Sequence, residues 1–168
     1  DMVSFGFLPG MIVFQLLSAH ASYNYLPYIG FLITLFSALR LAKFNIDERQ
    51  HTGFIGMPTP ANAIFWASLI VGCKDFLCSP RFNAVFLLAF IIMFCWLMIS
   101  ELRMFSLKFA NTTWEDNKVK YIFIILVVAI LAYAALSSDG TSNFVQNISR
   151  GIASCIGLYI VMALVARK

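Results

Sequence analysis

The sequence has few charged residues for its length. Only 12% of its 168 residues are Asp, Glu, Lys or Arg, and 61% are hydrophobic. A soluble domain carries roughly 25% charged residues. This shortage of charge excludes an ordinary soluble domain and indicates an integral membrane protein.

Patterns typical of other protein classes are also missing. The net charge is +4, but the basic residues form no stripe with interleaved aromatic residues, so we expect no nucleic-acid partner. The four cysteines lack the spacing of a zinc site. Cys73 and Cys78 bracket a predicted loop and could form a disulfide if that loop faces an oxidising compartment.

The chain has neither an initiating methionine nor a signal-peptide pattern, because Asp1 directly precedes an apolar run. We therefore expect it to be the carboxy-terminal part of a longer protein. Inverted repeats of the kind found in many transporters are not visible either. Their absence weakens a membrane transporter as an interpretation, without excluding it. A transporter or a purely structural bundle would also need polar groups spread through the midplane, whereas here they gather at one face of the membrane.

What the sequence does contain is a series of apolar runs suited to membrane helices, which need about 20 residues each. Six runs qualify, at about residues 2–19, 26–43, 59–74, 83–100, 119–137 and 150–166. The short connections between them leave no room for a soluble domain. We therefore predict an all-α, polytopic transmembrane helix bundle of about six spans, forming a single domain over residues 1–168.

Basic residues gather on one side of this predicted bundle. The side that also holds Asp1 carries nine cations: Arg40, Lys43, Arg49, Arg103, Lys108, Lys118, Lys120, Arg167 and Lys168. The other side carries three: Lys74, Arg81 and Arg150. By the positive-inside rule, the side with nine cations faces the cytoplasm.

The densest polar segment, residues 40–62, lies on this cytoplasmic side. Arg40 and Lys43 are three residues apart on a predicted helix, so they share a face and repel each other. A phosphate or carboxylate ligand would relieve that repulsion. The alternative is that both side chains extend to the lipid headgroups. Asn45 could donate to the same anion through its amide.

Prolines predict the local geometry around the spans. In the Met-Pro-Thr-Pro sequence of residues 57–60, each proline favours an extended conformation for the residue before it. Pro60 suits the first turn of the next helix, with Thr59 as its N-cap. Pro9, together with its neighbouring glycines, predicts a bend inside the first span.

Asp1 has two interpretations from its position alone. If the residues before it are helical, its carboxylate lies at the cytoplasmic end of a membrane helix, where ionisable groups often mark a functional site. The alternative is an ordinary helix-start aspartate, which the helix dipole favours.

Four segments together resemble a known family. Residues 1–6, Asp-Met-Val-Ser-Phe-Gly, look like the end of the aspartate-rich signature of the CDP-alcohol phosphatidyltransferases, at its last aspartate. Residues 40–45, Arg-Leu-Ala-Lys-Phe-Asn, and residues 54–61, Phe-Ile-Gly-Met-Pro-Thr-Pro-Ala, are similar to the bacterial phosphatidylserine synthase branch of that family, as are residues 104–109. The resemblance covers the chain up to about residue 122.

The resemblance implies an enzyme of phospholipid biosynthesis in the bacterial inner membrane, with its active site open to the cytoplasm. Its substrates would be CDP-diacylglycerol and L-serine. Asp1 would bind a divalent metal, Mg²⁺ or Mn²⁺, and would also act as the catalytic general base. Arg40 and Lys43 would bind phosphate or the serine carboxylate, with Asn45 as a weaker member of the pocket. A homodimer is possible.

The chain departs from the family pattern in one respect. The other aspartates of the signature would precede Asp1, so we expect the chain as given to lack a complete metal site and to be inactive alone. Glycerol 3-phosphate or another alcohol is the alternative acceptor within the family. A doubly charged phosphate would require more cations than Arg40 and Lys43, which favours serine.

Overall fold

The computed structural model describes residues 1–20, 23–47, 54–79, 84–104, 114–137 and 141–165. These parts of the chain are helical apart from turns and one very short pair of strands. The elements are η1 (Met2–Phe7), α1 (Leu8–His20), η2 (Leu26–Phe31), α2 (Leu32–Ile46), β1 (Phe54–Ile55), α3 (Thr59–Gly72), α4 (Lys74–Leu77), α5 (Ala84–Ile99), β2 (Arg103–Met104), α6 (Trp114–Leu136) and α7 (Thr141–Val165). The all-α prediction is confirmed.

Each of the six predicted spans corresponds to a helical segment, but the six are not equally long. Four are long and apolar enough to cross a membrane: Met2–His20, Leu26–Ile46, Asn117–Leu136 and Asn143–Val165. The other two, α3 and α5, are apolar but have only 14 and 16 residues. At 1.5 Å per residue α3 is about 21 Å long, less than the 30 Å of a typical hydrocarbon core.

The last helix begins earlier than we predicted. The apolar run starts near residue 150, whereas α7 already starts at Thr141. The intervening residues are mostly Thr, Ser, Asn and Gln, which continue the helix without adding hydropathy. Hydropathy therefore located the apolar part of α7, which suits the hydrocarbon core of a membrane, and missed the polar turns before it.

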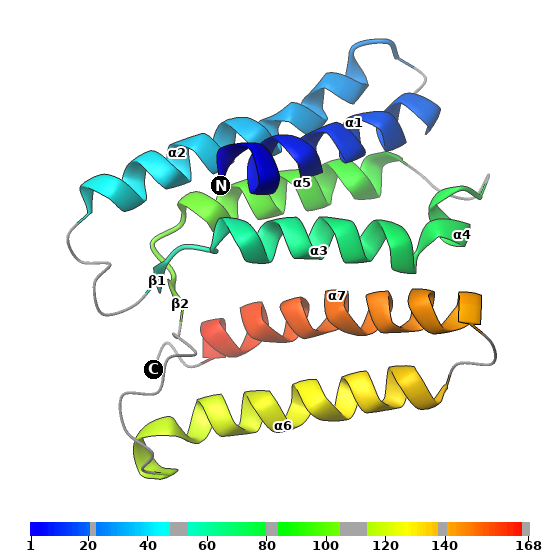
Figure 1. Cartoon of the computed structure of the whole chain (residues 1–168). Coiled ribbons are helices and arrows are strands. Elements are labelled where there is room, and N and C mark those ends of the chain that lie inside the picture. Colours follow the sequence, from blue (N-terminus) through cyan, green and yellow to red (C-terminus); the bar gives the residue numbers. More distant parts are fainter. Residues whose placement is uncertain (21–22, 48–53, 80–83, 105–113, 138–140, 166–168) are drawn as a thin grey trace.

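The helices alternate in direction and form a layered bundle. Figure 1 shows α7 lying between α3 and α6, with α1, α2 and α5 on the other side of α3. The core is built from side chains with almost no exposed surface, including Leu17, Ile33, Trp66, Ile91 and Phe94. Trp66 and Phe94 also contact each other, with ring centroids 5.8 Å apart.

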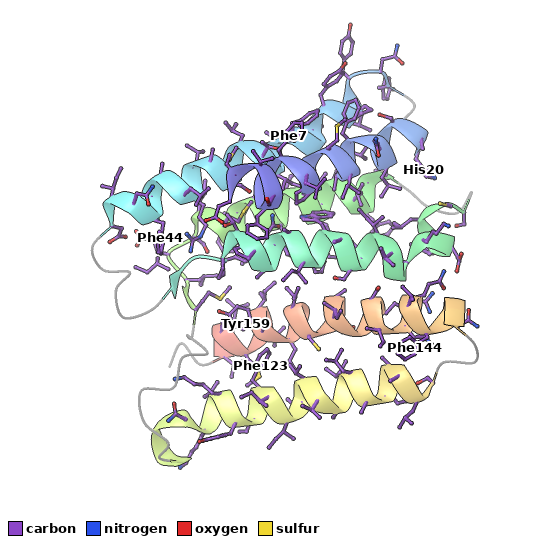
Figure 2. The ribbon with its side chains drawn as sticks, in the orientation of Figure 1. Phe7, His20, Phe44, Phe123, Phe144 and Tyr159 are labelled. Carbon is purple, nitrogen blue, oxygen red and sulfur yellow. The ribbon has the colours of Figure 1, made fainter. Side chains whose placement is uncertain are left out.

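The bundle has two ends, which we call the Arg40 end and the Arg150 end. The Arg40 end comprises the start of η1, the ends of α2, α5 and α7, the starts of α3 and α6, and both strands. The Arg150 end comprises the ends of α1, α3 and α6 and the starts of η2, α5 and α7. Figure 2 shows Phe44 at the first end and His20 and Phe144 at the second.

A compact turn ties the start of α3 to the end of α5. The strands β1 and β2 pair antiparallel, with Ile55 opposite Arg103. Beyond β1, the Gly56 amide donates to the Leu102 carbonyl at 2.8 Å and the Met57 amide donates to the Leu97 carbonyl at 3.0 Å. Gly56 has φ +75°, and a Cβ there would lie 2.6 Å from the Met98 carbonyl oxygen. Only glycine suits this position without strain.

The structure also bears on three smaller expectations from the sequence. Thr59 is the first residue of α3 rather than its N-cap, because Pro58, with φ −62° and ψ 137°, holds the extended position before the helix. The chain stays helical around Pro9, because η1 ends at Phe7 and α1 begins at Leu8, and the bend expected there stays a prediction. Cys73 and Cys78 are free thiols, so the possible disulfide is not formed.

Candidate active site at the Arg40 end

Asp1 directly precedes η1 as its N-cap and is exposed. η1 packs against α2 and α3. Gly6 lies against Ser37, and the Thr34 hydroxyl donates to the Gly6 carbonyl at 3.1 Å. η1 and α2 run antiparallel. Asp1, which precedes Gly6 in η1, therefore lies nearer to the part of α2 that follows Ser37, where Arg40 is. The fold therefore places Asp1 at the Arg40 end, as the sequence predicted.

Arg40 is buried, with 4% of its surface exposed. Its Nε donates to the Met57 carbonyl at 2.8 Å, and its guanidinium carbon lies 5.4 Å from the centre of the Phe44 ring. Within the described residues, no carboxylate forms a salt bridge with it. A buried cation is costly unless an opposite charge or hydrogen bonds compensate it. An anionic ligand at the guanidinium would supply the missing charge.

Lys43 lies one helical turn beyond Arg40 and contacts the end of α5. Its Nζ donates to the Ile99 carbonyl at 3.1 Å and lies 3.9 Å from the Glu101 carboxylate. The Glu101 side chain is 72% exposed, so this pair contributes little to stability. Both predicted cations thus donate to backbone carbonyls of other segments, a role that neither of our two interpretations included.

Asn45 is exposed in the last turn of α2. It follows Lys43 by two residues, which turns it about 200° around the helix axis. The structure therefore brings Arg40 and Lys43 to one region and places Asn45 on a different face. Its role in binding stays a prediction.

Two polar residues near this end were not among the site residues predicted from the sequence. Glu101 lies beside Lys43, as described above, and helps to line a pocket of about 350 Å³ together with Trp96, Ile99, Ser100 and Leu102. Asn62 is fully buried in α3, where its Oδ1 accepts a hydrogen bond from Trp66 at 3.0 Å. In the described structure its Nδ2 has no hydrogen-bond partner. Asn62 could have been noticed in the sequence, because it is a polar residue near the start of an apolar helix.

The metal implied by the resemblance needs several ligands. Divalent ions such as Mg²⁺ prefer an octahedral shell of oxygen ligands. In the part of the chain that the structure describes, no three Asp, Glu, His or Cys residues lie close enough to hold an ion. Asp1 offers one carboxylate, so the described residues do not make a metal site and we derive no step through a metal.

Comparison with known proteins gives three curated relatives with one name. A stretch of 64 residues is 42% identical to the CDP-diacylglycerol–serine O-phosphatidyltransferase of Bacillus subtilis (strain 168), covering 36% of this chain and 33% of the relative. The proteins of that name from Helicobacter pylori strains 26695 and J99 are each 27% identical over 139 residues, covering 79% of this chain and 54% of each relative. These proteins are its homologues. The family resemblance is thereby confirmed.

The matches have limits that bear on function. The chain spans a third to about half of the length of these curated relatives. No family model matches the chain. No solved structure matches it either.

Proposed function

We propose that this chain forms part of a membrane enzyme that transfers a phosphatidyl group from CDP-diacylglycerol to L-serine, giving phosphatidylserine and CMP. The shared name of the three homologues carries the proposal. The gathering of Asp1, Arg40 and Lys43 at one end of the bundle supports it, because a pyrophosphate substrate needs cations and an alcohol acceptor needs a base.

The proposed reaction assigns a part to each of these residues. The serine hydroxyl oxygen bonds to the phosphorus that bears diacylglycerol, the bond from that phosphorus to CMP breaks, and CMP leaves. The Asp1 carboxylate accepts the hydroxyl proton as general base. Arg40 binds a phosphate oxygen, and Lys43 binds phosphate or the serine carboxylate. A divalent ion, Mg²⁺ or Mn²⁺, remains a prediction from the resemblance, as do Asn45 in the pocket and a homodimer.

We further propose that the Arg40 end faces the cytoplasm of a bacterial inner membrane. Lys118 and Lys120 near the start of α6 lie at this end with Arg40 and Lys43, which agrees with the positive-inside assignment. A cytoplasmic position would give the site access to soluble serine and to CDP-diacylglycerol in the adjoining leaflet.

The test is an assay on the protein expressed from its complete reading frame. Membranes receive CDP-diacylglycerol, a divalent ion and either L-serine or glycerol 3-phosphate, and CMP release is measured for the wild type and for Asp1→Asn. Serine-dependent release that disappears in the variant would support both the reaction and the base. CMP release with glycerol 3-phosphate but not with serine would show that glycerol 3-phosphate is the acceptor. No release with any alcohol would favour a transporter or a structural bundle.

A further inference from the structure

A second polar site lies at the other end of the bundle. A pocket of about 410 Å³ opens between α6 and α7, and its polar lining consists of Tyr133, Ser137, Asn147, Arg150 and Ser154. The described residues that line it include no carboxylate. The pocket therefore presents a cation and neutral polar groups, a combination that suits an anion.

The floor of this pocket is a close helix contact. A Cβ on Gly151 of α7 would lie 3.2 Å from the Ala134 Cβ of α6. Small residues at such a contact let two membrane helices approach closely. Polar side chains from both helices line the pocket around this contact.

Arg150 is held in a fixed orientation. Its Nε donates to the carbonyl of Gly72, the last residue of α3, at 2.6 Å, and its Nη1 donates to the Asn147 amide oxygen at 3.3 Å. An arginine has five N–H donors. Among the described residues, no salt bridge reaches Arg150 and no hydrogen bond involves its Nη2. These two hydrogen bonds occupy two of the five donors and leave three for a ligand.

The sequence around the pocket suits the depth of the lipid headgroups. α6 ends at Leu136, and the turns of α7 before Arg150 are polar, whereas the residues after Gly151 are largely apolar. Arg150 therefore marks the boundary between the polar and the apolar part of α7. Tyr133, which is 76% exposed, lies at the same level, where tyrosines are enriched in membrane proteins.

Two hydroxyl groups add a further chemical requirement. Ser137 donates to the Tyr133 carbonyl, and Ser154 donates to the Arg150 carbonyl at 2.9 Å. Because each hydroxyl hydrogen is directed to its own helix, each oxygen is left to accept a hydrogen bond. A ligand that fits has a negative charge for Arg150 and an N–H or O–H donor for these serine oxygens.

We propose that this pocket binds a membrane glycerophospholipid from the leaflet at the Arg150 end. The phosphodiester contacts the Arg150 guanidinium, and the ammonium of an ethanolamine headgroup or the hydroxyls of a glycerol headgroup donate to Ser137 and Ser154. A guanidinium is suited to the phosphate of a headgroup, because it donates charge-assisted hydrogen bonds to phosphate oxygens. The site lies at the opposite end of the bundle from the proposed active site, so it does not depend on the proposed reaction.

Lipid binding to the full-length protein tests this site. The protein in detergent is titrated with phosphatidylethanolamine or phosphatidylglycerol, and bound lipid is counted by native mass spectrometry. Arg150→Gln should weaken binding roughly tenfold, the effect of losing a charge-assisted hydrogen bond. Lys74→Gln, an equal loss of charge on an exposed residue outside the pocket, should leave binding unchanged.

A second variant separates the lipid site from the contact with α3. Ser154→Leu fills the pocket and leaves the Arg150–Gly72 hydrogen bond in place, so it should lower lipid binding without changing the melting temperature of the lipid-free protein. Binding equal to wild type in Ser154→Leu would overturn the proposal even if Arg150→Gln fails to fold. Equal binding of diacylglycerol would overturn the phosphate contact, and displacement of the lipid by millimolar inorganic phosphate would reassign the site to free phosphate.

Discussion

Arg40 has one role in the fold and a second role in the proposed function. It is buried, which makes its charge costly, and it holds the backbone at Met57 by a hydrogen bond. No described carboxylate pairs with it, and in the proposed function a substrate phosphate would compensate its charge. The same side chain can therefore hold the start of α3 in place and stabilise a bound anion.

Replacing Arg40 should separate these roles. Arg40→Gln removes the charge, and we expect kcat/KM for CDP-diacylglycerol to fall at least about tenfold, because a charge-assisted hydrogen bond to phosphate is lost. The lost bond to Met57 should also lower the free energy of unfolding by about 1–3 kcal/mol. Kinetics in membranes and thermal unfolding in detergent measure the two effects. Unchanged kinetics in a folded variant would refute the phosphate contact.

Lys43 and Glu101 should behave differently, because the Glu101 side chain is largely exposed. Glu101→Gln should change the free energy of unfolding by less than about 1 kcal/mol, as for most surface pairs. Lys43→Gln should raise KM for serine or for CDP-diacylglycerol if Lys43 binds substrate. A Lys43→Gln enzyme with both KM values and kcat unchanged would leave Lys43 with only its structural contacts to the Ile99 carbonyl and the Glu101 carboxylate.

The sequence predicted which residues to inspect but not their partners. A spacing of three residues on a helix is enough to bring Arg40 and Lys43 to one face. Their acceptors are backbone carbonyls 17 and 56 residues further along the chain, and only the fold brings these close. Backbone acceptors have no residue type, so no sequence motif marks them.

At the scale of elements, the sequence predicted the helices well and their ends poorly. Hydropathy found all six segments because burial in lipid requires apolar side chains. It placed the start of α7 too late because polar residues can extend a helix beyond the hydrocarbon. The proline-rich segment 57–60 did predict a fixed start for α3, although Pro58 rather than Thr59 precedes the helix.

At the scale of elements, Gly56 in the turn before α3 should be sensitive to substitution. Gly56→Ala forces a Cβ onto a left-handed conformation and to within 2.6 Å of the Met98 carbonyl oxygen. We expect it to destabilise the protein by at least about 1–2 kcal/mol, the cost of left-handed geometry alone. Thermal unfolding in detergent measures this. Gly157→Ala is the control, because a Cβ at Gly157 meets nothing within 4 Å, and equal losses in both would contradict the expected strain.

At the scale of the molecule, the two polar regions occupy opposite ends of one bundle. The Arg40 end carries the candidate active site, and the Arg150 end carries the proposed lipid pocket. α3 and α7 connect them, since each runs from one end to the other and the two pack together. The orientation of the bundle therefore decides which leaflet each region meets.

Thiol labelling tests that orientation. Cys78 is exposed and lies at the Arg150 end, and Asn45 is exposed at the Arg40 end. With the other cysteines replaced by serine, a membrane-impermeant maleimide added to intact cells, with access to the outer surface of the cytoplasmic membrane, should label Cys78. Asn45→Cys in a Cys78→Ser background should react only after permeabilisation. The reverse pattern would invert the proposed topology.

The geometry of Gly56 also has a genetic consequence. Every missense change of a glycine codon introduces a side chain, and at Gly56 the first carbon of any side chain already meets two backbone carbonyl oxygens, those of Met98 and Ser100. Neither oxygen can move as a flexible side chain would. In a saturation library selected for growth that depends on the proposed enzyme activity, position 56 should therefore retain glycine codons, while position 157 accepts a range of small and apolar residues.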